Sequence, residues 1–434
     1  MTDAGAGFDA LSASAGPVAR GSVARVGIAT AITAACGYAV LYLAARTLDP
    51  AGFSVFGVFW GAFGLVTGAA NGLLQEATRD VRAASQSEAA ATDQRVDRPH
   101  THPMRVGAGV GLVAAAIIAG TSPLWAPHVF AESRPLSVAL LSIGLAGFCL
   151  HATLLGMLAG TGRWTNYGSL MVTDAVIRVL IAAAAFLLGW GLVGFLWATV
   201  GGAVAWILLL FASAGTRTAA QLRTPGEVST YLRGASHSIA ASGASAILVM
   251  GFPVLLKATS GQLGAAGGVV ILAVTLTRAP LLVPMTAMQG NLIAYFFDRR
   301  HARLRALVKP AAVVLAVGTV GVLAAGFVGP WLLRFAFGPQ YQTSGTLLAW
   351  LTAAAVAIAI LTLTGSATVA ASLHRAYSLG WVAATVAAAL LLTLPLSLQT
   401  RTVVALMCGP LVGIAVHVAA LARADDSSRV RTDV

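Results

Sequence analysis

The chain has 434 residues, of which 58% are hydrophobic and 10% are charged, and its mean hydropathy is +0.83. Soluble domains carry about 25% charged residues, so the composition excludes an ordinary water-soluble protein and predicts a membrane protein. The longest polar segment, residues 76–105, is shorter than the roughly 50 residues that a soluble catalytic domain needs. Cys36, Cys149 and Cys408 all lie in apolar runs, which argues against a disulfide framework.

Twelve apolar runs are long enough to cross a bilayer, which takes about 20 residues in a helix. They predict an all-α polytopic membrane protein with transmembrane helices at 26–45, 53–75, 106–126, 136–158, 167–189, 191–214, 239–256, 263–288, 311–333, 347–373, 377–398 and 402–421. Arg20 and Arg25 precede the first run as they would in a signal peptide, but the charge-free stretch is longer than a usual signal core. We therefore expect an uncleaved first helix.

The net charge of +12 suggests nucleic-acid binding until the basic residues are sorted by position. Cytoplasmic loops of membrane proteins retain Lys and Arg. With the N-terminus inside, twenty of the 27 Lys and Arg residues fall in seven inner segments, five fall in outer segments, and Arg178 and Arg278 fall within spans. This distribution predicts a protein of the bacterial cytoplasmic membrane with both termini in the cytoplasm, and it argues against a nucleic-acid partner.

Two inner turns indicate an internal repeat. GTGRWTNYG follows the fourth helix and ASLHRAYSLG follows the tenth, with Arg163 and Arg375 separated by 212 residues, although two short turns can also match by chance. Six helices in each half make the halves parallel repeats around a central cavity, an arrangement that supports alternating access. The predicted halves are 25–215 and 239–422, with a cytoplasmic linker at 216–238 and disordered cytoplasmic tails at 1–24 and 423–434.

Small residues predict close helix packing in the first half. Gly57, Gly61, Gly64 and Gly68 recur on one face of the second helix, and Gly107 and Gly111 do so in the third. Such faces let helix backbones approach each other closely. They serve either static packing or helix sliding.

Three turns resemble those of a known transporter family. RTLDPAGF at 46–53, GTGRW at 160–164 and FGPQY at 337–341 are similar to turns at those places in the polysaccharide (Wzx-like) flippases of the MOP exporter superfamily. Asp49 and Ser54 stand where that family usually has glycines, and the seventh helix lacks the acidic residue that many relatives carry. The resemblance extends along the whole chain and implies a MATE-like fold, while the missing carboxylate leaves the energy coupling open.

The resemblance implies a transporter and no enzyme. Its activity would be the movement of a polyprenyl-linked oligosaccharide from the inner to the outer leaflet, by alternating access, for cell-envelope polysaccharide biosynthesis. The implied partners are a polyprenyl-(pyro)phosphate-linked glycan, membrane lipid, and envelope-biosynthesis glycosyltransferases or a polymerase, and the protein itself is expected to be a monomer. No cofactor and no catalytic residue is expected, and coupling to the membrane potential, to protons or to sodium stays open.

A phosphate-bearing head group needs cationic partners inside the membrane, where an unpaired charge costs about 2.5 to 3.5 kcal/mol. Arg278 is the first choice for such a contact, because it lies mid-span and is followed by Pro280 and Pro284, which can break the helix and free backbone carbonyls. Pairing of Arg278 with carbonyls is the alternative. Asp174 and Arg178 share one helix face at i, i+4 spacing, so they either neutralise each other or contact the substrate.

Weaker substrate-binding candidates lie near the helix ends. Each has a plainer interpretation as a membrane-exit or interfacial residue. They are Asn71, Gln75 and Glu76 at the inner end of the second helix, Gln289 with Asn291 at the inner end of the eighth, and Arg46 and Lys257 at outer ends. The histidines His151, His374 and His417 are expected to pack or lie at the interface, and the His100-x-His102 pair has no further ligand nearby, so no metal site is expected.

Two other functions compete with the flippase. A small-molecule or drug cation antiporter on the same fold needs acidic residues in the membrane, and only Asp174 lies clearly within a span. A membrane glycan polymerase or ligase predicts a long outer loop with clustered charges, whereas the outer turns hold only Asp49 and Glu132 as acids. An assembly scaffold makes no such demand.

Overall fold

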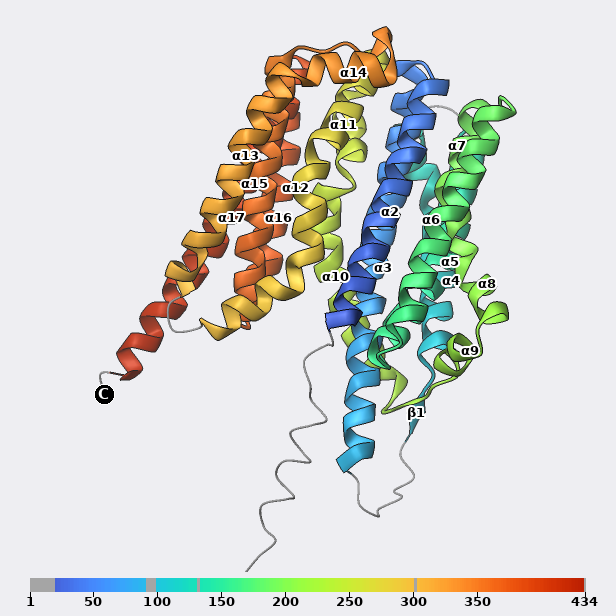
Figure 1. Ribbon diagram of the computed structural model, residues 1–434, viewed down its shortest axis with the longest axis vertical. Coiled ribbons are helices and arrows are strands. Elements are labelled where there is room, and N and C mark those ends of the chain that lie inside the picture. The colour runs from blue at the N-terminus through green and yellow to red at the C-terminus, as the bar shows by residue number, and fades with distance from the viewer. Residues whose placement is uncertain (1–19, 91–98, 131–132, 300–302, 433–434) are drawn as a thin grey trace, which may run out of the picture.

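The structure, a computed structural model, describes residues 20–90, 99–130, 133–299 and 303–432. Within these ranges, eleven helices are long and apolar enough to cross a membrane, and the pair α10 (Val228–Val249) and α11 (Phe252–Ser260), bent by 62°, makes a twelfth if it is counted as one span. The rest of the described chain consists of short helices, turns and one pair of two-residue strands (Figure 1). The predicted all-α membrane fold is confirmed.

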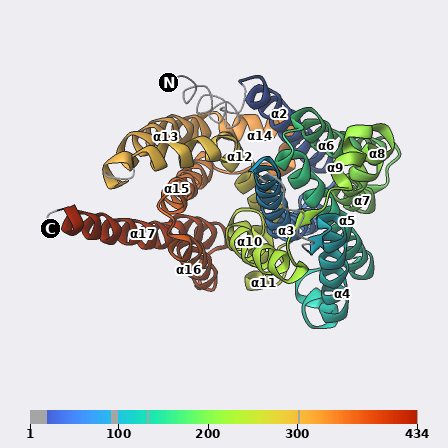
Figure 2. The same ribbon diagram turned by 90° about the horizontal axis from the view of Figure 1, so that it is seen from below.

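The first half of the chain forms one bundle of helices (Figures 1 and 2). Its elements are α2 (Arg20–Thr47), α3 (Pro50–Ala90), α4 (Pro103–Val129), α5 (Arg134–Gly160), α6 (Trp164–Leu187), α7 (Gly191–Gly201), the 3-10 helix η1 (Gly202–Val204), α8 (Ala205–Ala212) and α9 (Ala214–Ala220). The short strands β1 (His100–Thr101) and β2 (Thr224–Pro225) pair antiparallel beside the end of α3. The polar segment 76–105 is thus helical as far as Ala90, and residues 91–98 lie outside the described residues.

The second half forms a bundle on the other side of α10 and α11 (Figure 2). Its further elements are α12 (Gly264–Asp298), α13 (Arg303–Phe327), α14 (Gly329–Phe337), the 3-10 helix η2 (Pro339–Tyr341), α15 (Gly345–Ala370), α16 (His374–Leu392) and α17 (Leu398–Thr432). Both α10 and α12 pack extensively on α3, so the contact between the bundles is built around α3. The division into halves at 215 and 239 stays a prediction.

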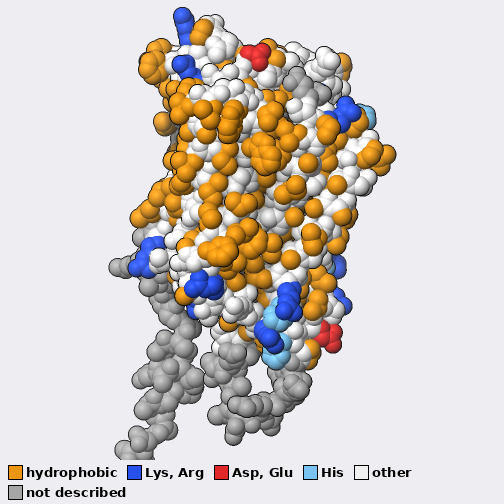
Figure 3. Space-filling view, turned by 90° about the vertical axis from the view of Figure 1, so that its right-hand side faces the viewer, with side chains coloured by type: hydrophobic (Ala, Val, Ile, Leu, Met, Phe, Trp, Pro, Cys, Tyr) orange, Lys and Arg blue, Asp and Glu red, His pale blue; other side chains and the backbone are white. Residues whose placement is uncertain are grey.

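The helices that are most buried, and those that are least buried, occupy equivalent places in the two bundles. Of the candidate spans, α3, α5 and α15 are the most buried, whereas α4 and α13 are the least buried. The pairs α4 with α13 and α5 with α15 are the third and fourth helices of their predicted halves, so equivalent helices have equivalent surroundings. On the face shown in Figure 3, an apolar belt separates Lys and Arg side chains at the two ends, as expected for a protein that crosses a bilayer.

Backbone hydrogen bonds in the turns that follow α5 and α15 correct the register of the repeat. Thr161, Gly162 and Arg163 donate backbone hydrogen bonds to Met157, Ala159 and Leu158, and the same three bonds recur 210 residues later. The bond from Tyr167 to Arg163 likewise recurs from Tyr377 to Leu373. The offset of 212 is therefore wrong by two residues: Arg163 corresponds to Leu373, and Arg375 is not its equivalent.

Two predicted helices differ from their expected course. α12 continues through Pro280 and Pro284 without a break and bends toward its lower end (Figure 1). The break lies instead in the seventh helix, at Met250 and Gly251, between α10 and α11. The described parts of both predicted tails are helical, since α2 begins at Arg20 and α17 runs to Thr432.

Candidate functional site

A stripe of glycines on α3 forms its contact with α10, α11 and α12. A Cβ atom at Gly68 would lie 2.6 Å from the Cβ of Ala246, and one at Gly57 would lie 2.7 Å from a methyl carbon of Ile271. A Cβ at Gly72 would collide with the backbone of Ile239. The predicted close-packing face is confirmed, and it joins α3 to helices of the second half of the chain.

Arg278 occupies the break between α10 and α11. Its Nη1 donates to the backbone carbonyls of Val249 at 3.0 Å and Leu248 at 3.4 Å. Those carbonyls end α10, and the helical donor for Val249 would be Pro253, which has no N–H. The guanidinium carbon lies 5.2 Å from the ring centroid of Phe252. Arg278 therefore stabilises the break in the seventh helix.

The second terminal nitrogen of the Arg278 guanidinium, Nη2, has no such partner among the described residues. Arg278 is only 7% exposed, and its Nη2 is buried without a hydrogen-bond acceptor among the described residues. A buried donor that is left unpaired is costly, and a charged one more so. The predicted alternative, pairing with carbonyls, thus accounts for one guanidinium nitrogen and leaves a second one available.

Asp174 and Arg178 form a bidentate ion pair inside the first bundle. Arg178 Nε and Nη2 donate to the two carboxylate oxygens of Asp174 at 2.9 and 3.0 Å, and its Nη1 donates to the carbonyl of Thr199 at 2.6 Å. The guanidinium also lies over the ring of Phe63 at 5.3 Å. Every guanidinium nitrogen of Arg178 has a partner, so the arrangement agrees with a pair that neutralises itself and joins α6 to α7.

Gln75 and Glu76, predicted at the inner end of the second helix, lie midway along α3 at its contact with α10. Gln75 Nε2 donates to Ser242 Oγ at 3.2 Å. Glu76 is 2% exposed and pairs at 2.5 Å with Arg79, while the absence of a side chain at Gly234 makes room for its carboxylate. Asn71 is half-buried on the same helix. Gln75 and Glu76 are thus used at least partly in helix packing, and a polar strip at a cavity mouth stays a prediction.

The remaining candidates do not join these groups. Gln289 is half-buried and Asn291 exposed near the end of α12, and Arg46 is exposed at the end of α2. Lys257 donates to the carbonyl of Gly261, which closes the end of its own helix. These placements agree with the interfacial interpretation, and substrate contact at any of them stays a prediction.

His417 and His151 are buried and His374 is exposed at a helix end, in agreement with the predicted packed or interfacial positions. His417 is fully buried between Thr364, whose Oγ1 is 3.0 Å from Nδ1, and the carbonyl of Tyr377, 3.2 Å from Nε2. His151 stacks on Phe148 at 5.3 Å, and His374 is exposed at the start of α16. The described residues contain no cluster of three or more His, Cys, Asp or Glu side chains that could hold a metal ion.

Sequence reasoning missed a contact between two of the motif turns. Tyr341, in η2, donates its hydroxyl to the carbonyl of Leu48 at 3.1 Å, and its ring packs edge-on against Phe53 at 5.8 Å. Tyr341 and Leu48 belong to two turns that carry the family resemblance, and both turns were predicted to lie on the outer side of the membrane. This common location could have suggested that the turns are near each other, but it did not predict which residues meet.

Close relatives by sequence are mycobacterial. An uncharacterized protein of Mycobacterium bovis is 72% identical over 414 residues, which cover 95% of each chain. The uncharacterized protein Rv1510 of Mycobacterium tuberculosis is 66% identical over 426 residues, covering 98% of this chain and 96% of that one. The chain belongs to the family of these mycobacterial proteins. No protein-family model matches it.

Solved structures place this mycobacterial family among known folds. An inward-facing multidrug resistance MATE family transporter of the MOP superfamily is similar over 94% of this chain and 99% of that one, with a TM-score of 0.65 and 15% identity. The outward-facing conformation gives a TM-score of 0.60 over 93% and 96%. A MOP superfamily transporter from Pyrococcus furiosus gives 0.56 at 16% identity. The chain therefore has a MATE-like fold, as predicted.

Proposed function

We propose that the protein is an alternating-access transporter that moves a polyprenyl-linked oligosaccharide, with a phosphate-containing head group, across the bacterial cytoplasmic membrane. In this proposal both termini lie in the cytoplasm, the basic inner segments face it, and the glycan is used for cell-envelope polysaccharide biosynthesis. The fold supports transport in general, because two such bundles can rock against each other and expose a site between them to each side of the membrane in turn.

The observation that favours an anionic substrate is the buried Nη2 of Arg278, which has no hydrogen-bond acceptor among the described residues. A guanidinium with a buried, unpaired donor in the middle of a span is stabilised when an anion completes its hydrogen bonds. The first residue of α11, Phe252, lies beneath this guanidinium, so the positive end of the α11 dipole is adjacent. Transporters use such half-helix starts to hold anionic groups of their substrates.

The cation antiporter is less well supported. A cation needs an acidic side chain that is free to bind it inside the membrane. Glu76 and Asp174 are the buried acids among the described residues, and each is already paired with an arginine. A membrane glycan polymerase or ligase gains no support from these contacts, because the described outer turns bring no cluster of acidic groups together. The contacts do not address an assembly scaffold.

The proposal is tested by depleting the protein in its host and analysing lipid-linked sugars. We expect one polyprenyl-linked glycan to accumulate on the inner leaflet and to clear on complementation with wild type but not with Arg278→Ala. Arg375→Ala, an exposed arginine at the start of α16, is the matched control and should complement fully. An unchanged glycan profile with altered drug sensitivity would reject this substrate in favour of the antiporter.

A further inference from the structure

Two turns that lie 293 residues apart meet at the end of the molecule opposite the C-terminus (Figure 1). The first turn joins α2 to α3 and contains Leu48. The second contains η2, which follows α14 and ends at Tyr341. Tyr341 is fully buried although it lies in a turn, and its hydroxyl donates to the Leu48 carbonyl at 3.1 Å.

The carbonyl of Leu48 is available because the chain turns there. Leu48 N–H still bonds to Ala44, and the next helix starts with the bond from Phe53 to Asp49, so the carbonyl between them has no place in either helix. Buried backbone carbonyls are nearly always paired. Tyr341 supplies the donor from the other half of the chain.

Aromatic rings extend this contact in both directions. Tyr341 packs against Phe53 of α3 at 5.8 Å and against Phe337 of α14 at 6.3 Å. Phe337 in turn meets Tyr42 of α2 at 5.8 Å. The two rings of the second half, Tyr341 and Phe337, thus lie between Phe53 and Tyr42 of the first half, beside the single hydrogen bond.

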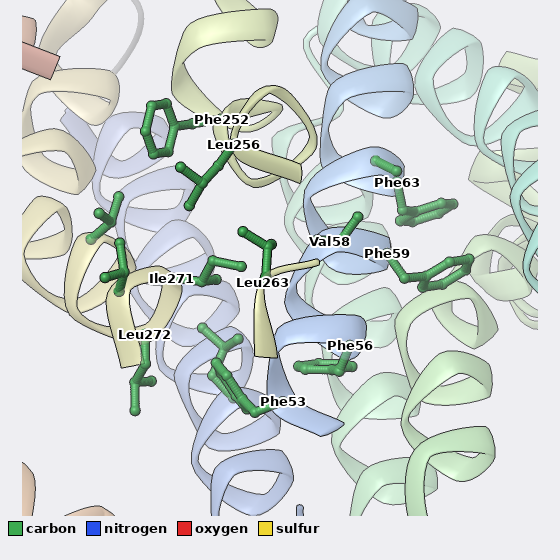
Figure 4. Packing of buried hydrophobic residues seen from close by; sticks show 14 of the residues in the cluster. Phe53, Phe56, Val58, Phe59, Phe63, Phe252, Leu256, Leu263, Ile271 and Leu272 are labelled. Carbon is green, nitrogen blue, oxygen red and sulfur yellow. The ribbon is translucent and has the colours of Figure 1, made fainter. Parts of the chain in front are cut away.

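A second contact closes the same end. Gly268 of α12 lies against the carbonyl of Pro50, where any side chain would collide. Leu263 and Ile271, at the start of the same helix, lie beside Phe53 in the packed cluster of Figure 4. The two halves are thus held together near the α2–α3 turn by both α12 and η2.

The segment that carries Tyr341 is suited to lie at a membrane surface. α14 runs across the helix ends in Figure 1, with Leu333 and Phe337 buried on one face and Trp331 and Phe335 exposed and stacked at 5.3 Å on the other. Exposed aromatic residues of this kind anchor helices in the lipid head-group region.

We infer that Tyr341 with Leu48 and the rings of Tyr42, Phe53 and Phe337 forms a latch that closes the outer end of the transport path, and that its release opens the path to the outside. The inference rests on the proposed transport function, because only a transporter needs this end to open. One net hydrogen bond biases such an equilibrium about two- to twelvefold, which is enough to favour the closed state and little enough to be reversed in each cycle.

The test measures access from the outer face and needs no glycan. Leu263→Cys, 8% exposed beside the latch, is the reporter in a background with Cys36, Cys149 and Cys408 replaced. Right-side-out membrane vesicles are treated with a membrane-impermeant maleimide. Tyr341→Phe keeps the ring and loses the hydrogen bond, so we expect labelling about two- to twelvefold faster, and faster again in Tyr341→Ala.

Tyr295→Phe is the matched control, because the Tyr295 hydroxyl donates to a backbone carbonyl, that of Ala306, within the second half of the chain. Its labelling rate should equal that of the parent. Equal rates for Tyr341→Phe, Tyr341→Ala and the parent would overturn the latch, as would acceleration seen only in inside-out vesicles.

A cross-link provides an independent measurement, because it holds the two halves together at the latch instead of releasing them. Tyr42→Cys with Phe337→Cys, joined by a short reducible bifunctional reagent, should lower labelling of Leu263→Cys, and reduction should restore it. Labelling that is unaffected by the cross-link would contradict the inference. If the latch behaves as expected while depletion causes no glycan accumulation, the substrate proposal fails and the latch stands.

Discussion

Gly202 lies so close to Asp174 that only the absence of a side chain leaves room for the carboxylate and its partner Arg178. The equivalent positions of the second half, 210 residues after the pair, are Ala384 and Ala388, which pack against Gly409. The helix after the pair is thus contacted through an ion pair in one bundle and through alanines in the other. The second bundle makes its helix contact without these charges.

This comparison predicts how the ion pair responds to substitution. Asp174→Ala leaves a buried, uncompensated arginine and should lower the free energy of unfolding by about 3 to 5 kcal/mol. The double variant Asp174→Ala, Arg178→Ala copies the second half and should be closer to wild type. Thermal unfolding in detergent measures both, and equal destabilisation by the single and double variants would contradict a self-contained pair.

The double variant also decides between the two roles left open for Asp174 and Arg178. If the pair is structural, the folded double variant should retain transport close to wild type. A folded double variant that has lost transport would show that the charges contact the substrate or take part in energy coupling.

The glycine stripe predicts a strong effect at Gly72. Gly72→Ala places a methyl group against the backbone of Ile239, which cannot move aside as a side chain can. We expect overpacking to cost about 1 to 3 kcal/mol. Gly109→Ala on α4, where no atom lies within 4 Å of the added carbon, is the control and should be neutral or stabilising. Similar melting temperatures for both variants would argue against a tight contact between α3 and α10.

The distribution of basic residues predicts the membrane orientation. Reporter fusions ending after Arg134 and after Gly226 should place the first outside and the second inside, because Arg134 starts α5 at its predicted outer end and Gly226 lies in the predicted basic inner segment before α10. Enzyme reporters active only on one side of the membrane make the measurement. The reverse pattern would overturn the orientation and would place the Tyr341 latch on the cytoplasmic side.

The sequence predicted the spans well because an apolar run long enough for a bilayer has few alternatives to a membrane helix. It also predicted the i, i+4 pair of Asp174 and Arg178, since that contact is local. The break in the seventh helix was missed, although Gly251 and Pro253 are present, because the run contains no charged residue and the freed carbonyls are paired by Arg278 from another helix. The sequence pattern within the seventh helix does not report that a side chain of another helix pairs its carbonyls.

The repeat illustrates the same limit. Matching the arginines of two turns set the register two residues away from the one that the backbone hydrogen bonds define. Tyr167 and Tyr377, which occupy equivalent positions, were the better signal. The contact of Tyr341 with Leu48 depends on how the two halves come together, and no periodicity within either half reports it.

Reconstitution with a fluorescent polyprenyl-pyrophosphate-linked glycan tests the central claim most directly. The measured quantity is the rate at which the labelled head group in proteoliposomes crosses to the leaflet exposed to a membrane-impermeant quencher. The account predicts crossing with wild type, crossing at the same rate with Arg375→Ala, and a loss of at least about tenfold with Arg278→Ala, the scale of one charge-assisted hydrogen bond. Crossing by folded Arg278→Ala at the wild-type rate, or no crossing by wild type above protein-free liposomes, would contradict it.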